Sequence, residues 1–411
     1  WFSRALSRPD GSASLILSSI DPYFRMKLDY IVTLHPGLSA MQLTIKLYNC
    51  RDARQPFMLW VNAGVPAGPG TRFIYPMGRT IGHTTSEVAD WPYYNGVDYS
   101  WFKNNKHMLG VFGIDVYDNF LGAYDYDKDY GTFRFADRRV TQGMKTWTWG
   151  MSGRAGSIER GYTDNAGPYI EIQSGRNVWD GHYEWLPPHT HEGWTEWWFP
   201  VSGIGGLTTT VRDLALNLEV KADPRGRKSS VRLGLSANRQ IDNAKVLITA
   251  AGTGAQVTLL ERTADLAPGK PFIAEAKNLA ADSAALSGMR VQVTDSDGIA
   301  VLDYRRPDRD PGHREYTPFT RKLEKPRKDP QQMSIEELVL DAETRIKEMH
   351  FETGTALLRM ALERDPGYSR AHLCLGLWFL DQGQPDSAEA HLKAVVERDP
   401  YNEEAYYGLA M

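Results

Sequence analysis

Three short runs between residues 145 and 199 alternate in side-chain type with a period of two, which restricts this part of the chain to β-strands. Each run has one face that carries both aromatic and hydrogen-bonding side chains. These faces are Lys145, Trp147 and Trp149 in KTWTW, Tyr169, Glu171 and Gln173 in YIEIQ, and Trp194, Glu196 and Trp198 in WTEWWF. If they line one concave sheet, Glu171, Glu196 and Lys145 converge on it.

Tryptophan is concentrated in the same region, because residues 91–200 hold nine of the twelve in the chain, interleaved with acids and amides. A core gains apolar volume more cheaply from residues without an indole N–H, so this composition favours a partly wet surface. Rings that stack on sugar C–H faces, beside groups that bind hydroxyls, are typical of carbohydrate sites. We therefore predict substrate-binding roles for Asn62, Trp101, Tyr124, Lys145, Trp147, Trp149, Gln173, His191 and Trp194.

Glycoside hydrolysis needs two carboxyl groups across the scissile bond, one acid and one base or nucleophile. Glu171 and Glu196 are the first candidates, and Asp98 and Asp125 come next. Indole rings near one carboxyl would hold its proton near neutral pH, whereas Lys145 would keep a neighbouring carboxylate ionised. The alternative for each acid is a hydroxyl-binding or salt-bridge residue.

Two function classes follow from these residues. The first is a glycoside hydrolase acting on an oligo- or polysaccharide through paired carboxylates. The second is a non-catalytic carbohydrate-binding or scaffold protein. A lyase that uses Tyr124 with Lys145 is a third reading. Asn62 has a second reading too, as a turn residue before Gly64, at the end of the apolar run QPFMLWVNAGV that we expect to be a strand buried on both faces.

The sequence contains no motif that clearly indicates a metal or a cofactor site. His189, His191 and Glu192 lie in the loop PPHTHEGW, which we place at the rim of the site and not in a metal centre. The glycine-rich GIGG at residues 203–206 has no strand-turn-helix context, so it predicts a turn and not a phosphate loop. We expect no cofactor.

The rest of the chain divides by composition. Residues 1–222 form the aromatic β-domain, and residues 223–307 form short Val, Leu and Ile strands that predict a small immunoglobulin-like sandwich. Residues 308–333 have linker composition. Residues 334–411 are helical and repeat with a shift of 34, so that Asp365 and Pro366 correspond to Asp399 and Pro400. This period predicts tetratricopeptide repeats and a protein or peptide partner.

Overall composition excludes some partners. The formal charge of −4 leaves no broad basic field for nucleic acid, and no apolar run has membrane-spanning length. Cys50 and Cys374 fall in different predicted domains, so we expect no disulfide. The chain starts without Met and stops within a repeat, so we interpret it as a fragment whose compartment is open, with the cytoplasm preferred.

The order and spacing of several motifs resemble a bacterial family of unknown function that precedes tetratricopeptide repeats and belongs to the galactose-mutarotase-like superfamily. The motifs are WPYYNGVDYSWFKN, FLGAYDYDKDYGTFRFADRR, QGMKTWTWG, GPYIEIQSG and TEWWFPV, within residues 15–222. The resemblance implies an antiparallel β-supersandwich whose concave face binds carbohydrate. Glu171 fits the family pattern, whereas Glu196 stands where relatives often have an amide, and Tyr126 where they often have His. The His motif of aldose epimerases matches no position.

Overall fold

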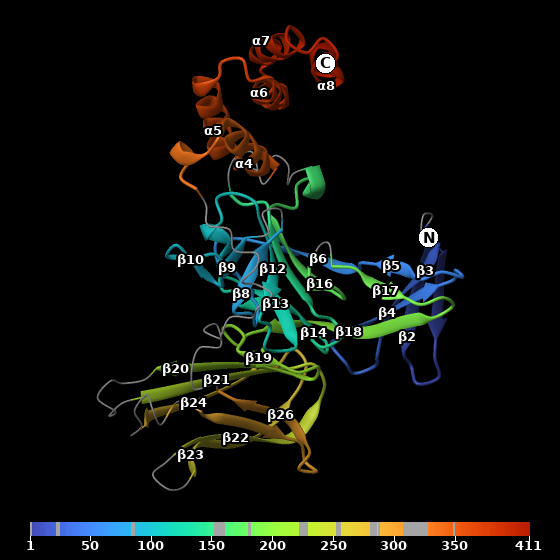
Figure 1. The fold of residues 1–411 in the computed structure, drawn as a ribbon. Helices are drawn as coiled ribbons and strands as arrows, with labels where there is room; N and C mark the ends of the chain where they lie inside the picture. Colours follow the sequence, from blue (N-terminus) through green and yellow to red (C-terminus); the bar gives the residue numbers. More distant parts are fainter. Residues whose placement is uncertain are drawn as a thin grey trace.

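The computed structural model describes residues 2–21, 25–83, 87–151, 161–179, 182–221, 229–251, 256–279, 286, 288–306, 328–347 and 350–411. In this part of the chain, two β-domains and a helical arm follow one another (Figure 1). The protein is therefore mainly β with C-terminal helices, as the sequence predicts.

Two antiparallel sheets build the first domain. The eight-stranded sheet runs, in spatial order, β1 (Phe2–Ser7), β2 (Ala13–Ile20), β3 (Met26–Leu34), β4 (Met41–Asn49), β18 (His191–Ser202), β14 (Tyr130–Phe135), β13 (Phe120–Asp125) and β7 (Thr71–Ile74). The six-stranded sheet runs β6 (Trp60–Pro66), β16 (Tyr169–Gly175), β15 (Gly143–Thr148), β12 (Leu109–Ile114), β8 (Arg79–Gly82) and β9 (Val88–Asp90). Smaller ribbons pair β5 (Gln55–Phe57) with β17 (Glu184–Leu186), and β10 (Tyr93–Tyr94) with β11 (Val97–Asp98).

The apolar core of this domain lies between the two sheets. Leu43, Ile45 and Leu47 of β4 are buried in one cluster with Ile170 and Ile172 of β16. Period-two alternation produces this directly, because every second side chain of each strand points to the same face. Each sheet consequently has a second face that does not contribute to this core.

The run QPFMLWVNAGV does not form the continuous buried strand that its composition suggests. It divides into β5 and β6, and β6 has no buried residue. Asn62 is exposed on it. The apolar side chains of β6 alternate between the core and an outer face, so composition alone misjudged their environment.

The second domain is a sandwich of two four-stranded sheets. One runs β19 (Thr209–Thr210), β20 (Leu214–Lys221), β21 (Ser229–Ala237) and β24 (Phe272–Leu279). The other runs β23 (Gln256–Leu266), β22 (Ile241–Ala251), β25 (Arg290–Thr294) and β26 (Ala300–Arg305). Strands β19 and β20 belong here, although the sequence placed residues up to 222 in the first domain, because β20 pairs along its whole length with β21.

A separate apolar cluster joins the two β-domains. Phe199 and Val201 of β18 pack in it with Ile204 and Leu207 of the connecting loop and with Ala215 of β20. Backbone contacts add to the junction, since Ser39 N–H donates to the Asn238 carbonyl at 2.7 Å. The outer face of the eight-stranded sheet is therefore partly covered by the second domain.

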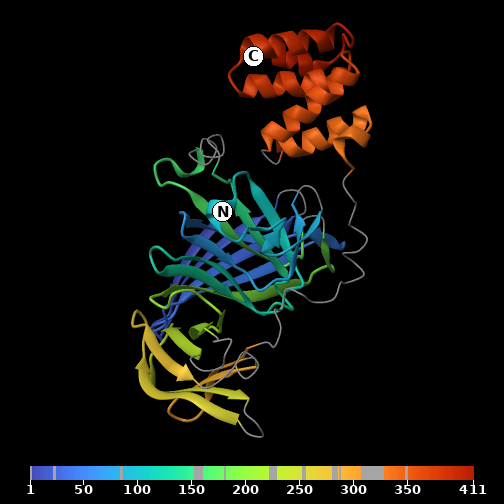
Figure 2. The ribbon, with the colours of Figure 1, turned by 90° about the vertical axis from the view of Figure 1, so that its left-hand side faces the viewer.

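The C-terminal arm consists of paired helices: α4 (Ile335–Lys347), α5 (Phe351–Arg364), α6 (Ser369–Asp381), α7 (Pro385–Val396) and α8 (Glu403–Ala410). Gly376 allows α6 and α7 to approach closely, because a Cβ there would lie 2.7 Å from Leu392 Cγ. Figure 2 shows the arm at one end of the first domain and the second sandwich at the other. Most of the predicted linker, 308–333, lies outside the described residues. Among the described residues, no helix is both long enough and apolar enough to cross a bilayer.

Candidate functional site

Glu171 stands on the outer face of the six-stranded sheet, opposite the apolar core. Its Oε2 accepts hydrogen bonds from Gln173 Nε2 at 2.8 Å and from Asn62 Nδ2 at 3.4 Å. Its Oε1 accepts one from the Tyr169 hydroxyl at 3.2 Å. The carboxylate is partly exposed and held by three neutral donors, so its orientation is fixed while it still meets solvent.

Aromatic rings adjoin this carboxylate. Trp147 is directly opposite Glu171 in the strand register, and its ring centroid lies 5.4 Å from that of Trp149. Trp149 Nε1 donates to the Tyr169 hydroxyl at 2.9 Å, and Trp149 stacks on Tyr162 with 12° between the ring planes. We call the surface formed by Asn62, Lys145, Trp147, Trp149, Tyr169, Glu171 and Gln173 the Glu171 face.

Lys145 is the cation of this face. Its Nζ lies 5.0 Å from the Trp147 ring centroid and 4.8 Å from that of Phe112. The side chain is 8% exposed, so its charge is held among rings by cation–π attraction. Gln173, directly opposite Lys145, is also buried.

Strand register and glycine explain how the rings fit. Gly110 is paired with Trp147, and a Cβ on it would lie 2.5 Å from that indole. Gly175 is paired with Trp60, and a Cβ there would lie 2.6 Å from the Trp60 ring. Each large ring therefore lies over a glycine of the neighbouring strand, where any other residue would place a side chain against the ring.

Several members of this surface were missed at the sequence level. Trp60, Phe112 and His83 extend the row of rings, since His83 lies 5.2 Å from Trp147 and 5.5 Å from Phe112. Their own runs give no alternation comparable to KTWTW. The glycines paired with the tryptophans indicate space for these rings, but the pairing can be recognised only once the strand register is known.

The predicted convergence of Glu196 with Glu171 is wrong. Glu196 is 0% exposed and lies between the two sheets, where Ser174 Oγ donates to it at 2.7 Å. Ser174 is three residues from Glu171 on β16 and so points to the opposite face. Trp194 is buried on the same inner side and donates from Nε1 to Glu196 Oε1 at 3.2 Å.

Asp98, Trp101 and Asp125 lie away from the Glu171 face, by the β7–β13 edge of the other sheet. Asp98 accepts from Arg72 Nη2 at 3.3 Å, and Trp101 forms a bridge with Arg72. Asp125 Oδ1 accepts from the backbone N–H groups of residues 127 and 128, which makes it a turn residue.

Tyr124 and His191 also take other positions than expected. Tyr124 is fully buried and its hydroxyl donates to Asp129 Oδ1 at 2.5 Å. Burial and the Asp129 carboxylate raise its pKa above the usual value, and its side chain packs with Phe199 and Val201 in the cluster between the two β-domains, away from Lys145. His191 stacks on Tyr48 with 5.6 Å between ring centroids, on the outer face of the eight-stranded sheet.

The histidine loop forms no metal centre in the described part of the chain, where no group of three His, Cys, Asp or Glu side chains is placed to hold an ion. His189 Nε2 instead lies 2.7 Å from Asp52 Oδ1, and Glu192 forms an ion pair with Arg176. These contacts fix a surface loop.

Chemically, the Glu171 face can offer one carboxylate, two amides, a phenol, an ammonium and several indoles to a polyhydroxylated ligand. The fold and this surface define a mainly β protein with a polar aromatic face and a helical repeat arm. The chain carries a domain of the family described as "Domain of unknown function (DUF5107)" at residues 5–201, followed by a tetratricopeptide repeat at residues 369–411. Residues 211–304 match the family described as "YphG-like protein, second domain".

Solved structures similar to this chain share little sequence with it. A TPR-domain containing protein from Parabacteroides distasonis is 16% identical with a TM-score of 0.47, over 100% of this chain and 64% of that one. A putative aldose 1-epimerase from Escherichia coli K12 is 11% identical with a TM-score of 0.38, over 49% of this chain and 68% of that one. A galactose mutarotase-like protein from Clostridium acetobutylicum is 9% identical with a TM-score of 0.35, over 49% and 66%. This chain thus spans less than two thirds of the Parabacteroides protein.

Proposed function

We propose that the DUF5107 domain binds a carbohydrate on the Glu171 face. The observation that carries this proposal is the Glu171 carboxylate, oriented by Asn62, Gln173 and Tyr169 and set beside the rings of Trp147 and Trp149. A sugar presents hydroxyl donors to the carboxylate and acceptors to the amides, while its C–H face covers an indole.

Glycoside hydrolysis is the more specific candidate, and Glu171 supports it as the acid or base. A hydrolase needs a second carboxyl group, and that group would have to come from a residue other than Glu196. Glu196 contacts Ser174 on the face of β16 opposite to Glu171. Carbohydrate binding without turnover needs only the side chains of the Glu171 face, so we favour a carbohydrate-binding function over hydrolysis.

The helical arm gives the protein a second role in this proposal. Tetratricopeptide helices stack so that a concave surface holds a peptide or protein. We infer that the arm recruits a protein partner while the β-domain holds a glycan.

One experiment tests the binding role and hydrolysis together. Wild type and Glu171→Gln are titrated against a panel of neutral oligosaccharides, and the release of reducing sugar is measured in the same samples. We expect Glu171→Gln to weaken binding by about tenfold, the loss of one charge-assisted hydrogen bond. Glu261→Gln, on the second domain with its side chain 54% exposed, serves as the control.

The outcomes separate the two readings. Binding without sugar release supports the carbohydrate-binding role. Release that disappears in Glu171→Gln supports hydrolysis. Binding and sugar release that are both equal in wild type and Glu171→Gln remove Glu171 from the site and contradict both.

A further inference from the structure

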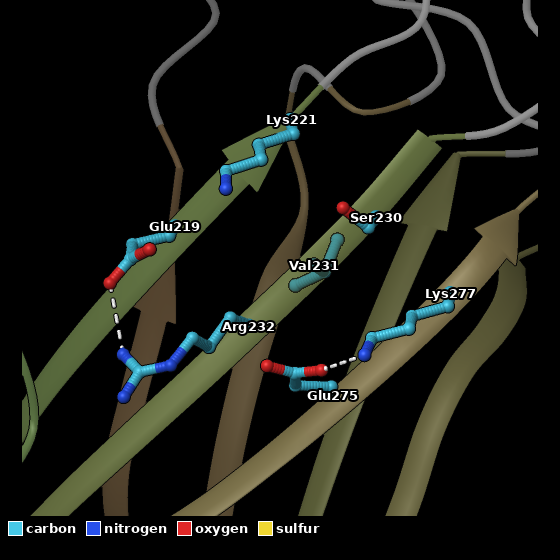
Figure 3. Close-up of a pocket in the computed structure, with 7 residues that line it drawn as sticks. All are labelled: Glu219, Lys221, Ser230, Val231, Arg232, Glu275 and Lys277. Atoms are coloured by element: carbon cyan, nitrogen blue, oxygen red, sulfur yellow. Dashed lines mark hydrogen bonds and ion pairs between the residues drawn. The ribbon is translucent and has the colours of Figure 1, made fainter.

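A polar groove lies on the second domain, on the outer face of the sheet formed by β20, β21 and β24. Its volume is about 190 Å³, and it is lined by Glu219, Lys221, Ser230, Val231, Arg232, Glu275 and Lys277. Figure 3 shows the charged side chains standing on one side of neighbouring strands. Glu219, Arg232 and Glu275 are directly opposite one another in the register, which explains why their charges form a row.

The Arg232 end of the groove adjoins an aromatic patch of the first domain across the loop at Gly205 and Gly206. A Cβ on Gly205 would lie 3.1 Å from Arg232 Nη1, and a Cβ on Gly206 would lie 3.1 Å from the Tyr126 hydroxyl. These adjacent glycines therefore have Arg232 on one side and Tyr126 on the other. Both glycines have positive φ, at 79° and 139°, so the loop stays without side chains between the two surfaces.

The patch on the first domain carries rings and cations together. Tyr126 is 37% exposed, and its ring centroid lies 5.2 Å from that of Trp101. Arg72 and Lys103 lie 5.3 Å and 4.7 Å from the Trp101 ring. Trp101 is thus covered by cations, and Tyr126 is the ring that remains open to a ligand.

Cations and acids alternate along this combined surface. The cations are Arg72, Lys103, Lys221, Arg232 and Lys277, and the acids include Asp98, Glu219, Glu275 and Asp129, whose Oδ1 accepts the Gly205 N–H at 2.9 Å. The ion pairs are partly exposed, with Arg232 Nη1 2.9 Å from Glu219 and Lys277 Nζ 2.6 Å from Glu275. Exposed pairs contribute little, so a ligand carboxylate can replace one partner at small cost.

We propose that the junction of the two β-domains is a second ligand site, which binds an acidic oligosaccharide across Tyr126, Arg72 and Arg232. Tyr126 stacks on one sugar ring, and carboxylates of the oligosaccharide replace Asp98 on Arg72 and Glu219 on Arg232, the acids to which these guanidinium groups donate at 3.3 Å and 2.9 Å. The remaining acids accept sugar hydroxyls. The groove is smaller than the ~300 Å³ at which sites for drug-sized ligands begin, which suits one ring-sized unit of a longer chain.

This site is independent of the Glu171 face, because Arg72 belongs to β7, Tyr126 follows β13 and Arg232 belongs to β21 of the second domain. GIGG, which shows no phosphate-loop context, here acts as the bare connection between the two walls of the site.

Isothermal titration with tetragalacturonate at low salt tests the proposal on the full chain, with neutral maltotetraose as the comparison ligand. We expect tetragalacturonate to bind, to bind more weakly as salt is raised, and to lose about tenfold in affinity in Arg232→Gln. Tyr126→Ala should lose a similar factor. Lys245→Gln is the matched control, since Lys245 is an exposed cation paired with Glu261 elsewhere in the same domain.

Several results would overturn the proposal. Wild type that does not bind tetragalacturonate, or Arg232→Gln that binds it as tightly as wild type, removes the site. Loss of this binding in Glu171→Gln places the ligand on the Glu171 face instead. Unchanged binding in Glu171→Gln, together with the loss in Arg232→Gln, supports two separate sites, whatever the neutral glycans do.

Discussion

The Glu196 carboxylate and the Arg134 guanidinium form an ion pair, 3.7 Å from Oε2 to Nε, that is sealed between the two sheets of the first domain. Arg134 donates from Nη2 to Ser174 Oγ at 2.6 Å, and the same hydroxyl donates to Glu196. Burial lowers the pKa of Arg134, and Glu196 opposes this shift. The three residues come from β14, β18 and β16, so the network ties one sheet to the other.

Removing one partner should therefore destabilise the protein strongly. We expect Glu196→Ala to cost about 3–5 kcal/mol of unfolding free energy, because Arg134 would stay buried without its counter-charge. Urea unfolding followed by tryptophan fluorescence measures this, since Trp194 and Trp198 both donate to Glu196. Glu171→Ala, on the outer face, should stay within ~1 kcal/mol of wild type. Equal midpoints for both variants would contradict the structural role of Glu196.

The junction between the β-domains should behave as part of one folding unit. Ile204 is fully buried in the cluster that joins them and lies against Gly234 of β21. Ile204→Ala should cost about 2–5 kcal/mol, because it leaves a cavity that the two domains share. Thermal unfolding of the full chain checks this, with Ile299→Ala as the control, since Ile299 is 64% exposed. A variant as stable as wild type would show that the domains are only loosely joined.

The rings of the Glu171 face should differ from other exposed tryptophans in their effect on glycan binding. We expect Trp147→Ala to weaken the binding of a glycan identified in the panel by roughly tenfold, because it removes a stacking ring opposite Glu171. Trp185→Ala should leave the affinity unchanged, since Trp185 is 53% exposed on the β17 strand and contacts Arg54 instead. Titration of both variants with the same glycan decides the matter. Equal losses would indicate a general effect of surface tryptophans.

The strands of this fold could be predicted from the sequence more completely than the residues of the site. Alternation assigns Ile170 and Ile172 to the core and Glu171 to the other face, and this is how β16 lies. Alternation divides the side chains of a strand into two faces, but it does not show which of the two faces points toward the core. Glu196 and Trp194 have the same pattern as Glu171 but belong to the opposing sheet, where their shared face points inward.

Asp98, Trp101 and Tyr124 were predicted least well, for a related reason. Asp98 ends the β10–β11 ribbon and Trp101 follows it, and their neighbour Arg72 comes from β7. Tyr124 was predicted to bind substrate, yet the second domain covers the face on which it lies. Packing between sheets and domains determines the burial and the neighbours of these side chains, and no single segment of the sequence predicts that packing.

The two cysteines should react at different rates. Burial and the Glu343 carboxylate raise the pKa of Cys374 to about 12, so little of the reactive thiolate is present at pH 8. Cys50 is exposed. Titration with a disulfide reagent at pH 8 should show one fast and one slow thiol, and Cys50→Ser should abolish the fast phase. Two equally fast thiols would contradict the packing of α4 on α6. In guanidinium both should react at once.

The helical arm should lose stability in mild acid because of a histidine pair. His372 Nδ1 lies 2.9 Å from His391 Nδ1, and His391 also stacks on Phe379. Burial, then the charges of His372 and Arg359, lower the pKa of His391 below its ordinary value of 6.5. Because the unfolded arm binds this proton more readily, the contribution is complete above pH 6.5. It is lost as the pH falls from there through the lower folded pKa.

Thermal unfolding followed by the helical circular dichroism signal at pH 8 and pH 5 measures this effect. We expect wild type to lose stability at pH 5 and His391→Gln to lose clearly less, with His189→Gln, an exposed histidine of the first domain, behaving as wild type. Glu343 does not interfere, because its pKa is already lowered from 4.5 by Arg370, so it titrates below this range. If His391→Gln kept the full pH dependence, the proton would have to bind elsewhere in the arm, and the neutral pair would not be what holds α6 against α7.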